Sequence, residues 1–301
     1  MKRIGLYIVF ICVMVQGFAQ QTPLYSLYMF NEFAYNPALA GSKDYYEAQV
    51  NNRYQFVGIE NAPVTATITL NGRLQAHPMG WGGMIYNDSQ GAFTKFGVYG
   101  AYAYHLKLGR YSKLSMGLNV GVIKYSIDMT KIKFLEEEQN LNESMYRSIR
   151  PDATFGLYYD ARHYFVGASL DQLFNNQIDI SADTIATDNT LNRFKSHLNI
   201  MAGCNYNLAK NVDFRASVVA RKVYAAPWQF EVSARVMYYN TIWAGASFRT
   251  QDAVALFAGY TYRKMISFGY SYDITYSKLK AGSRGAHEIF LSVAFDSKSK
   301  K

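Results

Sequence analysis

The chain has 301 residues, 16% of them aromatic (26 Tyr, 19 Phe and 3 Trp), and only 6 Pro. This length is compatible with one large all-β domain. The net charge of +9 includes Lys2, Arg3 and the lysines of the last four residues (298–301), and the remaining excess is dispersed. The absence of a basic block interleaved with aromatic residues argues against a nucleic-acid partner and favours contact with anionic lipid or a surface polysaccharide.

The first residues have the pattern of a secretory signal peptide. Two basic residues (2–3) precede an apolar run (4–15), and Ala19 provides a small residue for cleavage. The run is shorter than the about 20 residues that a membrane-spanning helix needs. We therefore expect residues 1–19 to be removed on export, which leaves Cys204 as the only cysteine and allows no intramolecular disulfide.

Residues 20–42 form an aromatic segment ahead of the first predicted strand. The stretch YSLYMFNEFAYNPALAG is uncharged except for Glu32, and small residues follow its Asn36-Pro37 pair. Pro37 fixes φ and has no backbone donor, so the chain must turn before the first strand begins.

Alternation of apolar and polar residues dominates the rest of the chain. In NVDFRASVVAR, for example, Phe214 and Val218 alternate with Arg215 and Arg221. Segments of roughly ten residues with one apolar face predict β-strands. We expect about fourteen strands, at residues 43–54, 63–73, 79–87, 92–106, 113–127, 152–159, 162–170, 194–207, 212–222, 228–238, 241–249, 253–262, 264–273 and 287–295.

The predicted connections alternate in length. Short links are expected at residues 77–78, 109–110, 160–162, 208–211, 239–240 and 263–264. Longer polar connections are expected at residues 55–62, 87–91, 128–150, 171–192 and 274–286. Tight periplasmic turns that alternate with longer extracellular loops are typical of an outer-membrane barrel.

The positions of the charged residues also favour a barrel. In hydrocarbon every backbone amide needs a partner, and a closed barrel leaves no unpaired edge. An Arg or Lys that faces lipid at mid-depth would cost about 2–4 kcal/mol. We therefore expect the charged residues on the phase opposite to the apolar one to line the lumen: Arg215, Glu231, Arg235, Arg249, Asp273 and Glu288.

The prediction is an all-β, transmembrane, antiparallel β-barrel over residues 43–295, a multi-pass protein of the cell outer membrane. Fourteen strands are expected, with twelve as the alternative count, and a polar tail follows at residues 296–301. Tyrosines near strand ends are expected in the two interfacial girdles: Tyr99, Tyr102, Tyr104, Tyr158, Tyr159, Tyr238, Tyr239, Tyr270 and Tyr272.

Nine stretches together resemble the PorP/SprF family, outer-membrane proteins associated with type IX secretion and gliding motility. In chain order they are YSLYMFNEFAYNPALAG, RYQFVGIENAPVT, GWGGMIYNDSQGAF, AYAYHL, PDATFGLYYD, YFVGASLDQLF, GASFRTQDAVALFAGY, FGYSYDITYSKL and GAHEIFLSVAF. Two positions depart from the family pattern: Phe56 stands where Trp is usual, and Ala286 where Ser is frequent.

The resemblance implies a role without catalysis and without a cofactor. Its expected partners are a secreted surface adhesin or other type IX cargo, periplasmic peptidoglycan-binding or motor-associated proteins, and outer-membrane lipid. The loops at residues 128–150 and 171–192 are the expected contacts for the adhesin, and the N-terminal segment and short turns those for periplasmic partners.

The Asn-Pro-Ala segment resembles the start of FadL-type barrels, whose N-terminal segments fold into the lumen. We therefore interpret residues 20–42 as a periplasmic or hatch segment, packed inside the barrel or at its periplasmic mouth. The residues expected to form this hatch and partner motif are Tyr28, Met29, Phe30, Asn31, Asn36, Pro37, Ala38 and Gly41.

Two other functions remain open at this point. A FadL-like transporter or a porin for small solutes would share the same architecture, and a soluble exported carbohydrate-binding β-protein would share the strands but not the membrane. An enzyme or a metalloprotein is not expected, because none of the five His has a partner at metal-ligand spacing. The acidic run at residues 136–138 also lacks the spaced oxygen ligands and the Gly of a calcium loop.

Overall fold

The computed structural model describes residues 24–74, 77–131, 145–174, 196–223, 226–277, 280 and 282–296. The predicted signal peptide and nearly all of the predicted tail lie outside these residues, so both stay predictions. The strands are β1 (Tyr45–Tyr54), β2 (Val64–Arg73), β3 (Met79–Gln90), β4 (Phe93–Lys107), β5 (Lys113–Asp128), β6 (Met145–Asp160), β7 (Tyr164–Asp171), β8 (His197–Ala209), β9 (Val212–Val223), β10 (Gln229–Tyr238), β11 (Ile242–Arg249), β12 (Ala253–Tyr262), β13 (Ile266–Thr275) and β14 (Ala286–Asp296).

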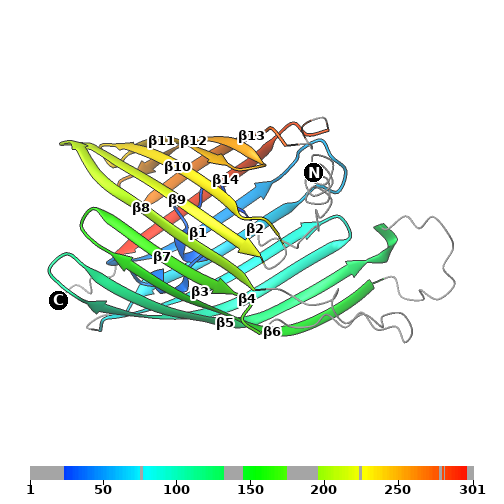
Figure 1. Ribbon diagram of the computed structural model, residues 1–301, viewed down its shortest axis with the longest axis horizontal. Coiled ribbons are helices and arrows are strands. Elements are labelled where there is room, and N and C mark those ends of the chain that lie inside the picture. The colour runs from blue at the N-terminus through cyan, green and yellow to red at the C-terminus, as the bar shows by residue number, and fades with distance from the viewer. Residues whose placement is uncertain are drawn as a thin grey trace, which may run out of the picture.

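These strands form one closed antiparallel barrel in which each strand pairs with its neighbours in the sequence (Figure 1). The barrel closes where β1 pairs with β14, in a register that runs from Tyr45 opposite Asp296 to Tyr54 opposite His287. The fourteen-stranded barrel predicted from the alternation is therefore confirmed. Closure gives every strand two hydrogen-bonded neighbours, as a membrane span made of strands requires.

Side chains alternate between an apolar outer surface and a polar lumen. On β10, Val232 points outward and is 51% exposed, whereas Glu231 and Ser233 are buried inside. On β14, Leu291 points outward and Glu288 lies in the lumen. An apolar outer surface is stable only against lipid, since a soluble protein rarely exposes so large an apolar area.

The connections between strands lie at the two ends of the barrel, and their lengths agree only in part with the predicted alternation of short and long. At the turn end, six connections of two to five residues join β2 to β3, β4 to β5, β6 to β7, β8 to β9, β10 to β11 and β12 to β13. At the opposite, loop end, the longest connections follow β5 and β7, but those after β3, β9 and β11 are short. The predicted sorting of connections by length is therefore confirmed at the turn end and only partly at the loop end.

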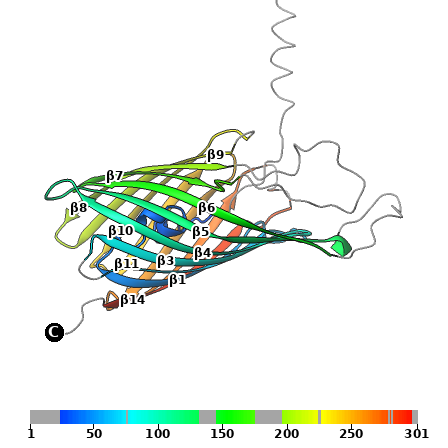
Figure 2. The same ribbon diagram turned by 90° about the horizontal axis from the view of Figure 1, so that it is seen from below.

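Two predicted loops are partly strand. Asn87 and Asp88, which were expected in a turn, lie in β3 opposite Phe96 and Lys95 of β4. The backbone pairing with β4 outweighs the turn propensity of these two residues. The turn contains only Gly91, with φ +60°, and Ala92. Likewise β6 begins at Met145, well before the expected residue 152, and β4 to β6 extend past the other strands at the loop end (Figure 2).

The girdle prediction was wrong for two tyrosines. Tyr99 and Tyr158 are 6% and 4% exposed and point into the lumen, whereas Tyr102, Tyr238 and Tyr270 lie on the outer surface. Tyr99 differs in strand phase from Tyr102, so the two side chains must point to opposite faces. Its hydroxyl donates a hydrogen bond to Asp152 Oδ2 (2.8 Å).

Helical structure in the described ranges is limited to the short 3₁₀ helices η1 (Glu32–Ala34), η2 (Pro37–Leu39) and η3 (Met129–Lys131). Over the same ranges, no helix has the length and apolar character needed to cross a membrane. Helices η1 and η2 belong to the segment inside the barrel.

Candidate functional site

Residues 24–42, named here the luminal segment, run through the barrel interior from the loop end to the turn end (Figure 2). Near its start, the Ser26 amide donates to Glu288 Oε2 (2.7 Å), at the loop end of β14. Near its exit, the Ala40 carbonyl lies 2.9 Å from Nε2 of His105, at the turn end of β4. Leu27 and Ala38 between them are fully buried. The predicted hatch residues thus lie within the lumen, and the segment begins at the end opposite to the turns.

The Asn-Pro pair attaches the middle of the luminal segment to the barrel wall. Asn36 Oδ1 accepts a hydrogen bond from the Ala38 amide (3.0 Å) and so caps η2, and Pro37 occupies the first turn of that helix, where no amide donor is needed. The Asn36 Nδ2 group donates to the backbone carbonyls of Leu157 (2.9 Å) and Ala168 (3.3 Å). One side chain therefore both shapes the segment and binds it to β6 and β7.

Glycines in the wall make this close approach possible. A Cβ atom on Gly156 would lie 2.0 Å from Asn36 Oδ1, and one on Gly117 would lie 2.3 Å from the Ala38 nitrogen. At the turn end, a Cβ on Gly80 would lie 2.0 Å from the Ala40 carbonyl oxygen. Larger residues here would push the luminal segment off the wall.

Aromatic packing fills the lumen beside the segment. The Phe30 ring lies 4.0 Å from the Trp243 ring and 5.5 Å from the Phe290 ring, measured between centroids. The Tyr28 hydroxyl lies 2.6 Å from Ser217 Oγ on β9.

The remaining predicted hatch residues are also inside. Asn31 donates from Nδ2 to Asn51 Oδ1 (2.9 Å) on β1, and Met29 is buried in the aromatic core. Gly41, with φ +63°, turns the chain out of the lumen toward β1. A Cβ there would lie 2.6 Å from the Gly72 carbonyl oxygen, so both the backbone angle and the space require glycine.

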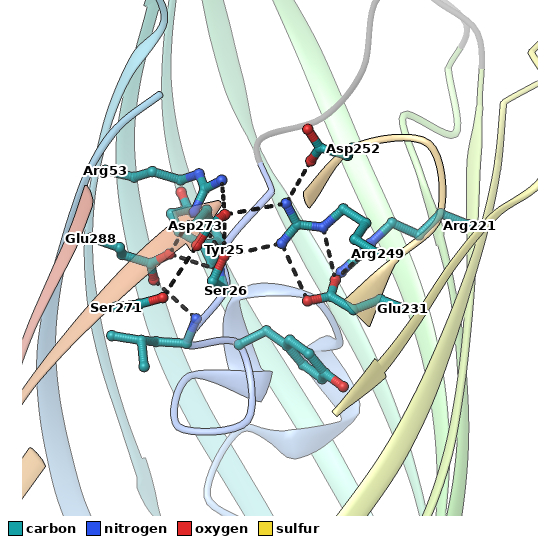
Figure 3. Close-up of polar contacts among 12 residues, drawn as sticks. Tyr25, Ser26, Arg53, Arg221, Glu231, Arg249, Asp252, Ser271, Asp273 and Glu288 are labelled. Carbon is teal, nitrogen blue, oxygen red and sulfur yellow. Dashed lines mark hydrogen bonds and ion pairs between the residues drawn. The ribbon is translucent and has the colours of Figure 1, made fainter. Parts of the chain in front are cut away.

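At the loop end, seven charged side chains surround Ser26 and form what we name the charged cluster (Figure 3). Its members are Arg53, Arg221, Glu231, Arg249, Asp252, Asp273 and Glu288. Ser26 Oγ donates to Asp273 Oδ2 (2.8 Å) and accepts from Arg53 (2.8 Å) and Arg249 (3.1 Å). The first turn of the luminal segment is therefore held by β1, β11, β13 and β14, which lie on one arc of the barrel at its closure.

Every carboxylate of the cluster has an arginine partner. Arg53 pairs with Asp273 (2.7 Å) and Glu288 (3.2 Å). Arg249 pairs with Glu231 (3.2 Å) and Asp252 (2.7 Å), and Arg221 also pairs with Glu231 (2.8 Å). The cluster holds four carboxylates and three guanidinium groups, and the amides of Ser26 and Leu27 add donors to Glu288. Such complete pairing offsets the high cost of burying these charges.

The structure separates the six charged residues predicted to line the lumen. Four of them, Glu231, Arg249, Asp273 and Glu288, belong to the charged cluster. Arg215 lies nearer the turn end and pairs with Glu32 of the luminal segment. Arg235 places its guanidinium carbon 4.7 Å from the centre of the Phe30 ring.

Three charged members of the cluster and Ser26 were missed by sequence reasoning. Arg53 and Arg221 fall on the inward phase of their strands, so the alternation contained a signal for both. Asp252 lies in a connection and Ser26 in a non-repeating segment, where no period marks a direction. Only the folded barrel shows that they meet.

A cavity of about 410 Å³ remains beside the luminal segment at the turn end. Phe30, Phe290 and Met237 supply apolar walls, and Arg235 and Lys264 supply positive charge. Within the described ranges, no three His, Cys, Asp or Glu side chains come together in an arrangement that could hold a metal ion. The lumen thus offers packing, ion pairing and one partly polar cavity.

Comparison with known proteins identifies a family and a fold. A family model described as type IX secretion system membrane protein PorP/SprF matches residues 17–293. No curated protein matches the chain. Among solved structures, the toluene transporter TbuX of Ralstonia pickettii is similar, with 10% identity, a TM-score of 0.53, and coverage of 90% of this chain and 94% of that one.

Two further barrels are similar to the chain. One is a FadL homologue of Pseudomonas aeruginosa, with 11% identity, a TM-score of 0.46, and coverage of 91% of this chain and 95% of that one. The other is the toluene transporter TodX of P. putida, with 10% identity, a TM-score of 0.49, and coverage of 88% and 93%. Of these structures, the one with a TM-score above 0.5 is TbuX, and at 10% identity its likeness shows a shared barrel fold alone.

Proposed function

Because the chain belongs to the PorP/SprF family of type IX secretion system membrane proteins, we propose that it anchors or escorts a secreted surface adhesin at the outer membrane. In this proposal the barrel also connects the adhesin to periplasmic peptidoglycan-binding or motor-associated proteins. The protein performs no catalysis and needs no cofactor.

The observation that carries the proposal is the filled lumen. The luminal segment extends from the charged cluster to the turn end, and its side chains pack against both halves of the wall. A barrel whose interior is held by buried ion pairs and an aromatic core is suited to be a rigid membrane anchor. Partner binding then belongs to the ends of the barrel, with the loops at 128–150 and 171–192 facing the adhesin.

The test is purification of the protein from its native outer membrane in mild detergent, with identification of whatever remains bound. A large secreted surface protein, or a periplasmic peptidoglycan-binding component, is the expected companion. A variant in which a Gly-Ser linker replaces residues 175–192 should lose the surface protein. The control, Tyr111→Ala in a turn-end connection, should retain it. Recovery of the chain with no partner would contradict the proposal.

A FadL-like transporter or a porin is the second candidate function, and the turn-end cavity favours it. The cavity volume is within the range of small-molecule sites, and its walls are partly apolar. This function predicts that the purified protein conducts ions or takes up solutes in a bilayer. Uptake that rises when residues 24–41 are deleted, together with the absence of any protein companion, would favour it over the anchor.

A further inference from the structure

Arg235 is a cation in the lumen for which the described residues offer no carboxylate partner. It makes no ion pair and no hydrogen bond with them, and its buried Nε is among the atoms without a partner. Its guanidinium carbon lies over the face of the Phe30 ring, 4.7 Å from the ring centre. A charge withdrawn from water is costly unless an opposite charge or hydrogen bonds compensate it.

Arg215, the cross-strand neighbour of Arg235, adds a second positive charge at this position. In the register between β9 and β10, Arg235 lies directly opposite Arg215, and like charges in such a pair repel. Glu32 neutralises Arg215. Asp213, also on β9, accepts a hydrogen bond from Asn207 (2.5 Å) and does not line the cavity. Among the described residues, Arg235 therefore has no carboxylate at ion-pair distance at this point of the lumen.

Arg235 lines the turn-end cavity. Four cationic side chains and two carboxylates line it, which gives the lining a net charge of +2. One carboxylate, Glu47, pairs with Lys43 (2.6 Å), and the other, Glu32, pairs with Arg215. Arg235 in the wall and Lys264 at the rim are the two cations that remain.

The rest of the lining defines what an anion must carry. Phe30 and Phe290 form an aromatic wall, and Met29, Met237 and Met265 add flexible apolar surface. A guanidinium group binds a carboxylate through two parallel hydrogen bonds. We propose that the turn-end cavity binds a carboxylate attached to an apolar group, with the carboxylate on Arg235 and the apolar group on Phe30 and Phe290.

The proposal does not depend on the adhesin-anchoring function, and small probes test it. Calorimetric titration of the full-length protein in detergent compares 4-phenylbutyrate with the neutral 4-phenylbutanol. The acid is expected to bind at least about tenfold more tightly, the difference that one charge-assisted contact supplies. Equal affinities of the acid and the alcohol would overturn the proposal without any variant.

Matched variants locate the site. Arg235→Gln should remove the preference for the acid, and Arg235→Lys should restore part of it. Arg162→Gln, which removes an exposed turn-end charge outside the cavity, should behave like the wild type. Loss of the preference in both Gln variants would mean that general surface charge attracts the acid, and would overturn the assignment to Arg235. Heat-dependent migration on gels verifies that each barrel is folded.

A peptide comparison separates two sources of the carboxylate. Ala-Ala-Phe with a free C-terminus and its C-terminal amide are titrated in the same way. Binding of the acid peptide with loss in Arg235→Gln would assign the cavity to a polypeptide terminus. Binding of 4-phenylbutyrate alone would assign it to a small organic acid. Either result supports the site, and failure of both acids refutes it.

Discussion

Single residues in the lumen connect several neighbouring strands through buried charges. Arg249 is 1% exposed and lies within ion-pair distance of Glu231, Asp252 and Asp273. Its guanidinium group also donates to Ser26 Oγ. The loss of such a residue leaves Asp252 without its arginine partner and removes one of the two arginine partners of Glu231 and of Asp273.

We predict that Arg249→Leu lowers the free energy of unfolding by about 3–5 kcal/mol, the cost of breaking a buried ion pair from one side. Urea unfolding in lipid vesicles, followed by tryptophan fluorescence, measures the change. Arg110→Leu, at an exposed turn-end arginine, is the control and should leave the urea midpoint almost unchanged. Equal midpoints for the two variants would show that the charged cluster contributes little to stability.

The contact between Gly156 and Asn36 yields a second prediction at this scale. Gly156→Ala places a methyl group where Asn36 Oδ1 and Pro37 lie, and overpacking of this kind costs about 1–3 kcal/mol. The luminal segment should loosen while the barrel stays closed, so limited proteolysis should cut within residues 24–42 earlier than in the wild type. Gly100→Ala, with no atom within 4 Å of the added carbon, should be cut at the wild-type rate. Equal cutting of both variants would argue against tight packing at Gly156.

Each strand has an outward-facing and an inward-facing set of side chains, and the two sets have different roles. On β9 the outward set includes Val218, 43% exposed to the surroundings of the barrel, and the inward set includes Ser217, Val219 and Arg221. The outward set determines insertion in lipid, and the inward set determines what the lumen holds.

Val218→Arg should therefore reduce insertion, because a charge on the lipid face costs about 2–4 kcal/mol at mid-depth. Arg215→Gln, on the inward set of the same strand, should insert normally and weaken the luminal contacts of this side chain to Glu32 and to the Phe165 ring. The measurement is the fraction of heat-modifiable protein in the outer membrane. If both variants accumulate equally, the assignment of the two faces of β9 is wrong.

At the scale of the whole molecule, closure of the barrel and filling of the lumen are separate events. Pairing of β1 with β14 closes the ladder without any residue of the luminal segment. The segment then occupies the interior, with Leu27 and Ala38 fully buried.

Deletion of residues 24–41 should accordingly leave a folded barrel with a higher conductance than the full-length protein. Planar bilayer recordings of both proteins at equal insertion levels measure the difference, and heat-dependent gel migration verifies folding. A full-length protein that already conducts as well as the deletion variant would mean that the luminal segment does not occlude the lumen.

The alternation of apolar and polar residues was enough to predict the number of strands, the face on which each side chain lies and the closure of the barrel. Alternation along β10 separated Val232 from Glu231, because successive side chains of a strand must point to opposite faces. One error arose where the local pattern competed with strand pairing. Asn87 and Asp88 favour a turn in isolation, yet their register with β4 extends the strand through them.

An outer-membrane barrel could be predicted from the sequence, because each strand has one apolar face, charged residues lie on the opposite face, and short connections recur between strands. Which luminal residues meet depends on the tertiary structure. Arg53 and Glu288 are 235 positions apart and come together at Ser26 through the closing pair of strands. The tertiary structure also places the luminal segment across the whole interior and leaves Arg235 without a carboxylate at ion-pair distance among the described residues. These outcomes depend on strand register and on the path of a non-repeating segment, and neither is encoded in any local period.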